Sequence, residues 1–197
     1  MTRVARKIRI SVEEYLKIEQ EDNQRYEYLN GLLYAMAGGT VPHNEIGGNL
    51  FGHLWGNSTV RGRGCKPYNS DTKIEITKEE RYVYSDTFVV CGELDESTAI
   101  SGAIRNPVVI FEVVSDSSVH YDHGDKFRAY RTLRSLREYV IVDQHQPTIT
   151  VYRRDNPQMI FQRIDFEGMD AVLTLDSIGA EIPFSVIYQS VNMDQAE

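Results

Sequence analysis

The feature that most constrains the fold is an apolar run with one charge inside it, in which Val108–Phe111 and Val113–Val114 flank Glu112. A short run of this composition is typical of a strand that is buried on both faces of a sheet. An unpaired carboxylate in such a strand costs several kcal/mol, so it must be protonated, ion-paired or bound to a metal. The sequence leaves two explanations for Glu112: a functional carboxylate, or a side chain that strand alternation turns towards an exposed sheet edge.

Periodicity predicts further elements on both sides of this strand. Ser11-Val12-Glu13-Glu14 has the pattern of a capping box and opens a helix that runs to about Gln20. Asn30-Gly31 between two apolar stretches predicts a hairpin. Pro42 starts a second helix, and residues 124–133 again have helical spacing.

Four more strands are expected at residues 72–76, 81–90, 138–143 and 148–153. The order of these elements predicts an α/β (α+β) fold with a central mixed β-sheet flanked by helices. Strand and helix do not alternate regularly enough for a doubly wound nucleotide-binding fold, and the chain has no glycine-rich phosphate loop. Without repeats or linkers, residues 1–197 are expected to form a single domain.

The charge is unevenly distributed along the chain. The formal net charge of −8 is unusual for a protein that binds nucleic acid. However, residues 75–125 carry three basic and eleven acidic side chains, whereas residues 126–154 carry seven basic and two acidic ones. An acidic segment able to bind cations therefore adjoins a basic segment able to contact phosphates. Solvated surface charge explains the same pattern, so it permits a metal-assisted nuclease without requiring one.

The cellular location is predicted from cysteines and hydropathy. Cys65 and Cys91 lie far apart without a paired spacing, which argues against a disulfide framework or a cysteine zinc site and fits a reducing cytoplasm. Residues 11–22 are charged where a secretion signal would need an apolar core. The longest apolar run is too short to span a bilayer. We therefore expect a cytoplasmic protein that does not enter a membrane.

Two more residues join Glu112 in a candidate site. Asp86 lies among aromatic residues of the expected strand 81–90. Alone it is a common strand-break residue, but beside Glu112 it gives the two convergent carboxylates that a hard divalent cation needs. Lys126 falls near the middle of the apolar arc of its helix. It either extends out from the first turn to solvent or points at a buried anion, and the two carboxylates favour the second.

Other polar residues are weaker candidates. The run His120–His123, with Asp125, resembles a metal-binding cluster, but a polar loop before a helix explains it better. His43, at the start of the second helix, could approach a phosphate, and a solvent-exposed cap explains it equally well. Glu27, opposite Tyr34 in the expected hairpin, has an ordinary cross-strand position.

Eight blocks occur in an order that is specific to one family: SVEEYLKIE, RYEYLNGLLYAMAG, PHNEIGGNL, SDTKIEI, YVYSDTFVVC, VVIFEVVSDSS, YDHGDKFRAYRTLRSLREYVIVDQ and VYRR. With them the chain resembles the Uma-two family of the PD-(D/E)XK nuclease superfamily over about residues 11–188. The resemblance implies a restriction-endonuclease-like fold and a Mg²⁺-dependent endonuclease that cuts DNA, with Mn²⁺ as a substitute metal.

The resemblance also implies residue roles. Asp86 matches the aspartate of the first motif and Glu112 the acidic residue of the second, although Ser85 stands where the family usually has proline. Val114 occupies the usual position of the superfamily's lysine, and Lys126 matches the place on the following helix to which this family has moved that lysine.

Further expectations follow from this assignment. Glu27 aligns with a glutamate that is typical of the family hairpin and is a further candidate carboxylate. Asp86, Glu112 and the carbonyl of Val113 are expected to hold Mg²⁺, while Lys126 stabilises the attacking hydroxide and the charge that grows on phosphorus. Cutting both strands of a duplex calls for two sites, so we expect a homodimer. The alternative function is an inactive nuclease-fold module that binds nucleic acid or a protein partner.

Overall fold

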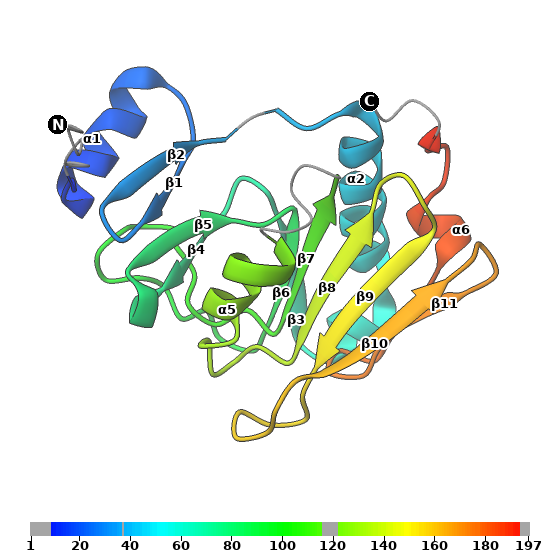
Figure 1. Ribbon diagram of the computed structural model, residues 1–197. Coiled ribbons are helices and arrows are strands. Elements are labelled where there is room, and N and C mark those ends of the chain that lie inside the picture. The colour runs from blue at the N-terminus through cyan, green and yellow to red at the C-terminus, as the bar shows by residue number, and fades with distance from the viewer. Residues whose placement is uncertain (1–8, 37, 116–121, 194–197) are drawn as a thin grey trace, which may run out of the picture.

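The computed structural model of the protein describes residues 9–36, 38–115 and 122–193. Its central element is a six-stranded sheet, shown in Figure 1. The strands of this sheet lie in the order β10 (Gln162–Glu167), β9 (Thr148–Arg153), β8 (Glu138–Asp143), β7 (Val109–Val114), β6 (Thr87–Cys91) and β3 (Cys65–Asn69). Because β7 is parallel to β8 and antiparallel to β6, the sheet is mixed, as the sequence predicts.

The central strand β7 is buried along its whole length, as expected from its composition. Val109, Phe111 and Val113 belong to the core on one face of the sheet, and Ile110 and Val114 to the core on the other face. Since alternate side chains of a strand point to opposite faces, Glu112 points into the same core as Ile110 and Val114. Glu112 is 4% exposed, so the alternative of an exposed sheet edge is wrong.

Helices cover both faces of this sheet (Figure 1). The helices α2 (Val41–Gly56) and α6 (Phe184–Ile187) pack on one face, together with the two-stranded ribbon of β11 (Val172–Leu175) and β12 (Ala180–Pro183). Thr40 caps α2 by accepting a hydrogen bond from the N–H of His43 at 3.3 Å. A short helix, α3 (Ser58–Gly62), follows α2.

The opposite face carries the segment that the sequence predicts as a helix over residues 124–133. It consists of a π-helical turn, η2 (Asp122–Lys126), and a single α-helical turn, α5 (Phe127–Tyr130). Ala129 and Tyr130 are buried against the sheet, so the expected apolar face is confirmed.

The N-terminal region confirms two local predictions. The capping box of Ser11 and Glu14 is present with both of its hydrogen bonds, and it starts α1 (Val12–Asp22). The hairpin of β1 (Tyr26–Leu29) and β2 (Leu32–Ala35) turns at Asn30 and Gly31, which have φ angles of 49° and 87°. Both residue types tolerate the left-handed region, which is why this dipeptide favours a tight hairpin.

The prediction of one strand over residues 81–90 is wrong. β5 (Arg81–Tyr84) pairs with β1 and β4 (Lys73–Ile76) in a separate four-stranded sheet of order β2-β1-β5-β4, with the short 3₁₀ turn η1 (Thr77–Glu79) between β4 and β5. β6 pairs with β3 and β7 in the six-stranded sheet. Both halves alternate in the same way, so periodicity cannot reveal that the chain changes sheets between them. The break places Asp86 at a junction between two sheets.

The expectation that the cysteines stay unpaired is also wrong, because Cys65 and Cys91 form a disulfide. The two residues lie directly opposite each other in the antiparallel register of β3 and β6. Strand pairing brings them together across 26 residues of sequence, so their spacing gave no signal. Within the described residues, no helix is long and apolar enough to cross a membrane.

Candidate functional site

Three segments that are distant in sequence meet at the carboxyl end of β7. The Oδ2 atom of Asp86 accepts a hydrogen bond of 2.6 Å from the backbone N–H of Val113, the residue after Glu112. Lys126 Nζ lies 2.9 Å from Glu112 Oε1. The two carboxylates and the lysine that the sequence selects therefore lie together, on the sheet junction, on β7 and on η2.

The pairing of β6 with β7 explains the position of Asp86. β6 pairs with β7 only from Thr87 to Val89, opposite Phe111 to Val109, so the ladder ends before Val113. The side chain of Asp86 takes the N–H that the ladder leaves unpaired. The N–H and C=O of one strand residue point to the same side. The carbonyl of Val113 therefore faces the side on which Asp86 lies.

Lys126 is the positive centre of the site. Besides Glu112, its ammonium lies 3.5 Å from Glu27 Oε1 and 3.7 Å from Asp122 Oδ1. Burial lowers the pKa of Lys126, but the charges of Glu112, Glu27 and Asp122 outweigh that effect, and the net pKa lies well above the usual value. The lysine therefore stays protonated, and of the two orientations considered for it, the inward one is observed.

Negative charge exceeds positive charge around Glu112. Burial raises the pKa of the Glu112 carboxyl well above its usual value, and the charge of Lys126 opposes this shift, while those of Asp122 and Asp86 add to it. Three carboxylates, those of Glu112, Glu27 and Asp122, lie within 3.7 Å of the single ammonium of Lys126. Such an excess of buried carboxylate favours the binding of a cation.

Two residues of the site were not singled out from the sequence. Tyr130 donates a hydrogen bond of 2.9 Å from its hydroxyl to Glu112 Oε1. Tyr130 lies one turn after Lys126 on the same apolar face, which could have indicated a role in the site. An ordinary core residue would occupy the same position. Asp122, 5% exposed, was seen only as part of the His120–His123 run.

The rest of that run does not converge on the site. His123 Nδ1 lies 3.1 Å from the hydroxyl of Tyr152, and Asp125 forms an exposed ion pair with Arg128. His120 lies outside the described residues. The choice between a polar loop and a metal-binding cluster for this run therefore stays a prediction.

His43 belongs to the site, a point that the sequence left open. Its Nε2 atom lies 3.3 Å from Asp86 Oδ1, and the side chain is 25% exposed. Burial lowers the pKa of His43, but the hydrogen bond and charge of Asp86 outweigh burial and raise it above the usual value. The protonated form of this imidazole is thereby favoured, and when it forms at the N-terminus of α2 it places positive charge beside Asp86.

The donor atoms present fit a magnesium ion. Among the described residues, no three His, Cys, Asp or Glu side chains are grouped so that they alone could hold a metal. Mg²⁺ does not need such a group, because it typically binds one or two carboxylates and keeps several waters. The carboxylates of Asp86 and Glu112 and the main chain of Val113 supply hard oxygen donors of that kind.

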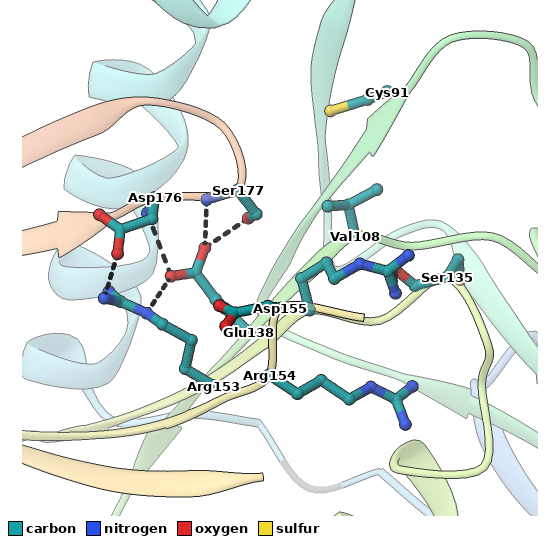
Figure 2. A pocket seen from close by; sticks show the side chains of 10 residues that line it. Cys91, Val108, Ser135, Glu138, Arg153, Arg154, Asp155, Asp176 and Ser177 are labelled. Atoms are coloured by element: carbon teal, nitrogen blue, oxygen red, sulfur yellow. Dashed lines mark hydrogen bonds and ion pairs between the residues drawn. The ribbon is translucent and has the colours of Figure 1, made fainter. Parts of the chain in front are cut away.

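A separate cavity of about 450 Å³ lies at the amino-terminal end of β8 and contains another buried acid, Glu138 (Figure 2). Glu138 accepts hydrogen bonds from Arg153 Nε at 2.8 Å, from the N–H groups of Asp176 and Ser177, and from the Ser177 hydroxyl. Its hydrogen-bonding capacity is thus fulfilled by the fold. We assign it a structural role, and place the candidate site at Glu112.

The mixed sheet with its flanking helices, and the cluster of carboxylates and lysine at Glu112, define a protein with a restriction-endonuclease-like fold. A crystal structure described as "a putative nuclease belonging to DUF820" from Anabaena variabilis superposes with a TM-score of 0.72 at 17% identity, over 93% of this chain and 99% of that one. At such identity the likeness establishes the fold alone.

Sequence comparison then identifies the family. The model of the Uma2 family, described as "Putative restriction endonuclease", matches residues 12–185, and the chain therefore belongs to this family. The uncharacterized protein slr1290 of Synechocystis sp. is 33% identical over 183 residues, 93% of each chain. A second uncharacterized Synechocystis protein, sll1609, is 30% identical over 145 residues, which cover 74% of this chain and 81% of that one.

Proposed function

We propose that the protein is a Mg²⁺-dependent endonuclease that hydrolyses phosphodiester bonds of DNA. One observation carries this proposal: Asp86 accepts a hydrogen bond from the backbone N–H next to Glu112, and Lys126 contacts the carboxylate of Glu112. Membership of the Uma2 family and the DUF820 structure support the nuclease class. The excess of carboxylates accounts for the need for a divalent cation.

Each residue has a distinct proposed role. Asp86, Glu112 and the carbonyl of Val113 would hold Mg²⁺, with Mn²⁺ as a substitute. When bound, this cation would supply polarisation of the phosphate and a water of lowered pKa. Lys126 holds its ammonium where negative charge grows on phosphorus, and Glu27 and Asp122 keep that ammonium charged and fixed.

Two further proposals concern the oligomeric state and the cellular location. We propose a homodimer, since cleavage of both strands of a duplex requires two sites and two-fold pairs are the commonest oligomers. Light scattering that finds a monomer at high concentration would remove this part without affecting the chemistry. We also propose the cytoplasm as the location. In that location the Cys65–Cys91 disulfide is expected to be reduced, because cytosolic proteins rarely keep disulfides.

The decisive experiment is incubation of the purified protein with supercoiled plasmid and with labelled oligonucleotides in Mg²⁺, Mn²⁺ or EDTA. We expect nicks or cuts with either metal and none in EDTA. A crystal soaked in Mn²⁺ is expected to show the ion between Asp86 and Glu112. If the protein binds DNA and never cuts it under any metal, the inactive binding module becomes the better explanation.

A further inference from the structure

A groove runs from the candidate site along α2. One section, of about 220 Å³, is lined by residues that include His43, Gly47 and Asp86. The next section, of about 260 Å³, lies between Trp55 and the edge strand β3. Phe51 and Asn69 line both sections, so the two sections adjoin along α2. Trp55 lies twelve positions after His43 on α2, a rise of about 18 Å, which several nucleotides can span.

The distal section presents an aromatic pair. Trp55 is 58% exposed, and its ring stacks on that of Phe51 with centroids 5.8 Å apart and an interplanar angle of 26°. The two residues are one turn apart on α2, so they share a face of the helix. Phe51 is partly buried, so the ring that faces solvent is mainly that of Trp55. Lys66, exposed on β3, adds a positive charge beside it.

The proximal section leaves the backbone of α2 accessible beside Asp86. A Cβ atom on Gly48 would meet no other group within 4 Å, and one on Gly47 would meet only Asp86 Cβ, at 4.0 Å. No side chain from these two positions occupies the groove. Asn44 and Asn69 also line this section; the amide nitrogen of Asn44 donates to the Gly39 carbonyl and that of Asn69 to Asp71, which leaves each one further N–H. A sugar-phosphate chain can therefore approach the carboxylate closely.

We infer that this groove binds a single strand of DNA, whose unpaired bases stack on the Phe51–Trp55 pair while a phosphate of the same strand lies at Asp86. The inference rests on the proposed nuclease function and narrows its substrate class to DNA with unpaired nucleotides beside the scissile bond. Both faces of a base within a duplex are already covered by its neighbours. An aromatic platform beside a cationic side chain is the arrangement that binds single strands with little sequence preference, because every base has a π face.

Trp55 gives a direct test, since it is the only tryptophan of the chain. Its fluorescence is measured during titration of the Lys126→Ala protein with a single-stranded oligonucleotide in Mg²⁺, because this variant is expected to keep the metal at Asp86 and to cut about 100-fold more slowly or less. The matched control is a blunt duplex that contains the same sequence. We expect saturable quenching by the single strand and little quenching by the duplex, because only an unpaired base reaches the indole. Equal quenching by both, or none by either, overturns the inference.

Variants separate stacking from general attraction, with binding measured by the anisotropy of a labelled single strand. Trp55→Ala is expected to weaken binding roughly 5- to 100-fold, the usual effect of losing one stacked base. Trp55→Phe, which keeps an aromatic ring, is expected to retain most of the affinity. Ile160→Ala is the control, because Ile160 is 87% exposed and lines neither section of the groove. Equal affinity of Trp55→Ala and wild type contradicts the inference.

Cleavage in Mn²⁺ distinguishes the failure of this inference from that of the nuclease proposal. If the protein cuts DNA but shows no selective quenching, the endonuclease stands and the stacking platform is lost. If single strands quench Trp55 and no DNA is ever cut, the platform stands and the catalytic proposal fails. If Trp55→Ala instead converts a dimer into a monomer without changing DNA affinity, the aromatic pair is a contact between two copies of the chain.

Discussion

Glu112 on β7 and Glu138 on β8 are buried acids on adjacent parallel strands, yet their surroundings differ. Burial raises the pKa of both carboxyls, so burial alone does not distinguish them. Around Glu138, the hydrogen bonds and charges of Ser177 and Arg153 lower the pKa again. Around Glu112, the charge of Lys126 also lowers the pKa, but the charges of Asp122 and Asp86 act against it and raise the pKa. A buried acid is therefore informative about function when its neighbours leave charge unbalanced.

The largest expected effect is on the cleavage rate, which is expected to depend on Glu112 and not on Glu138. Asp86→Asn and Glu112→Gln are each expected to reduce cleavage by on the order of 1,000-fold or more, because each removes a metal-binding charge without changing shape. Glu138→Gln is the matched control and is expected to keep the cleavage rate of the folded protein. The measurement is plasmid nicking in Mg²⁺ and Mn²⁺. If Asp86→Asn cuts as fast as wild type, the site assignment is wrong.

The second effect is on stability, where a change at Glu138 is expected to cost more than a change at Glu112. Glu138→Ala leaves Arg153 without its buried partner and is expected to lower the free energy of unfolding by about 3 kcal/mol, or the Tm by roughly 6–12 °C. Glu112→Gln relieves an excess of buried carboxylate, so its Tm is expected to be unchanged or higher in EDTA. Thermal denaturation followed by circular dichroism checks both. A larger loss in Glu112→Gln than in Glu138→Ala would contradict the difference drawn between the two acids.

The third effect concerns the lysine that faces Glu112. Lys126→Ala is expected to reduce cleavage by about 100-fold or more while Mn²⁺ binding remains, because the carboxylates are still present. Cleavage assays and calorimetric metal titration measure the two properties separately. Unchanged cleavage would end the proposed role of Lys126 and direct attention to His43, which contacts Asp86.

A double variant sharpens this test. Val114 follows Glu112 by two positions and points to the same face of β7. Lys126→Ala combined with Val114→Lys is therefore expected to recover part of the lost activity. Failure of the double variant alone is weaker evidence, since Val114 is 2% exposed and a lysine there disturbs the packing of the core.

The smallest effect tests the hydrogen bond from Tyr130 to Glu112. Tyr130→Phe removes one donor to a carboxylate, which corresponds to about 1.5 kcal/mol, or a reduction in cleavage of roughly tenfold. Tyr188→Phe is the control, since the Tyr188 hydroxyl donates to backbone carbonyls of Asp143 and Gln146, away from the site. If both variants cut at the wild-type rate, Tyr130 has only a packing role.

The local elements and the main candidate site residues could be predicted from the sequence alone. The capping box at Ser11, the turn at Asn30-Gly31 and the buried strand around Glu112 follow from interactions between near neighbours in the chain. For the same reason, the helical phase of Lys126 placed its side chain on the inner face. Asp86 alone could not be distinguished from an ordinary strand-break residue. It became a candidate through its pairing with Glu112 and through the family resemblance.

Which distant residues meet is seen only in the tertiary structure. The passage of the chain from one sheet to another at Asp86, the disulfide between Cys65 and Cys91, and the approach of His43 to Asp86 all depend on strand pairing and helix packing over long separations. The same holds for the two buried acids. Glu138 is balanced by Arg153 and Ser177, whereas Glu112 lies among other carboxylates. The packing of distant segments sets these side-chain partners, and local periodicity carries no information about them.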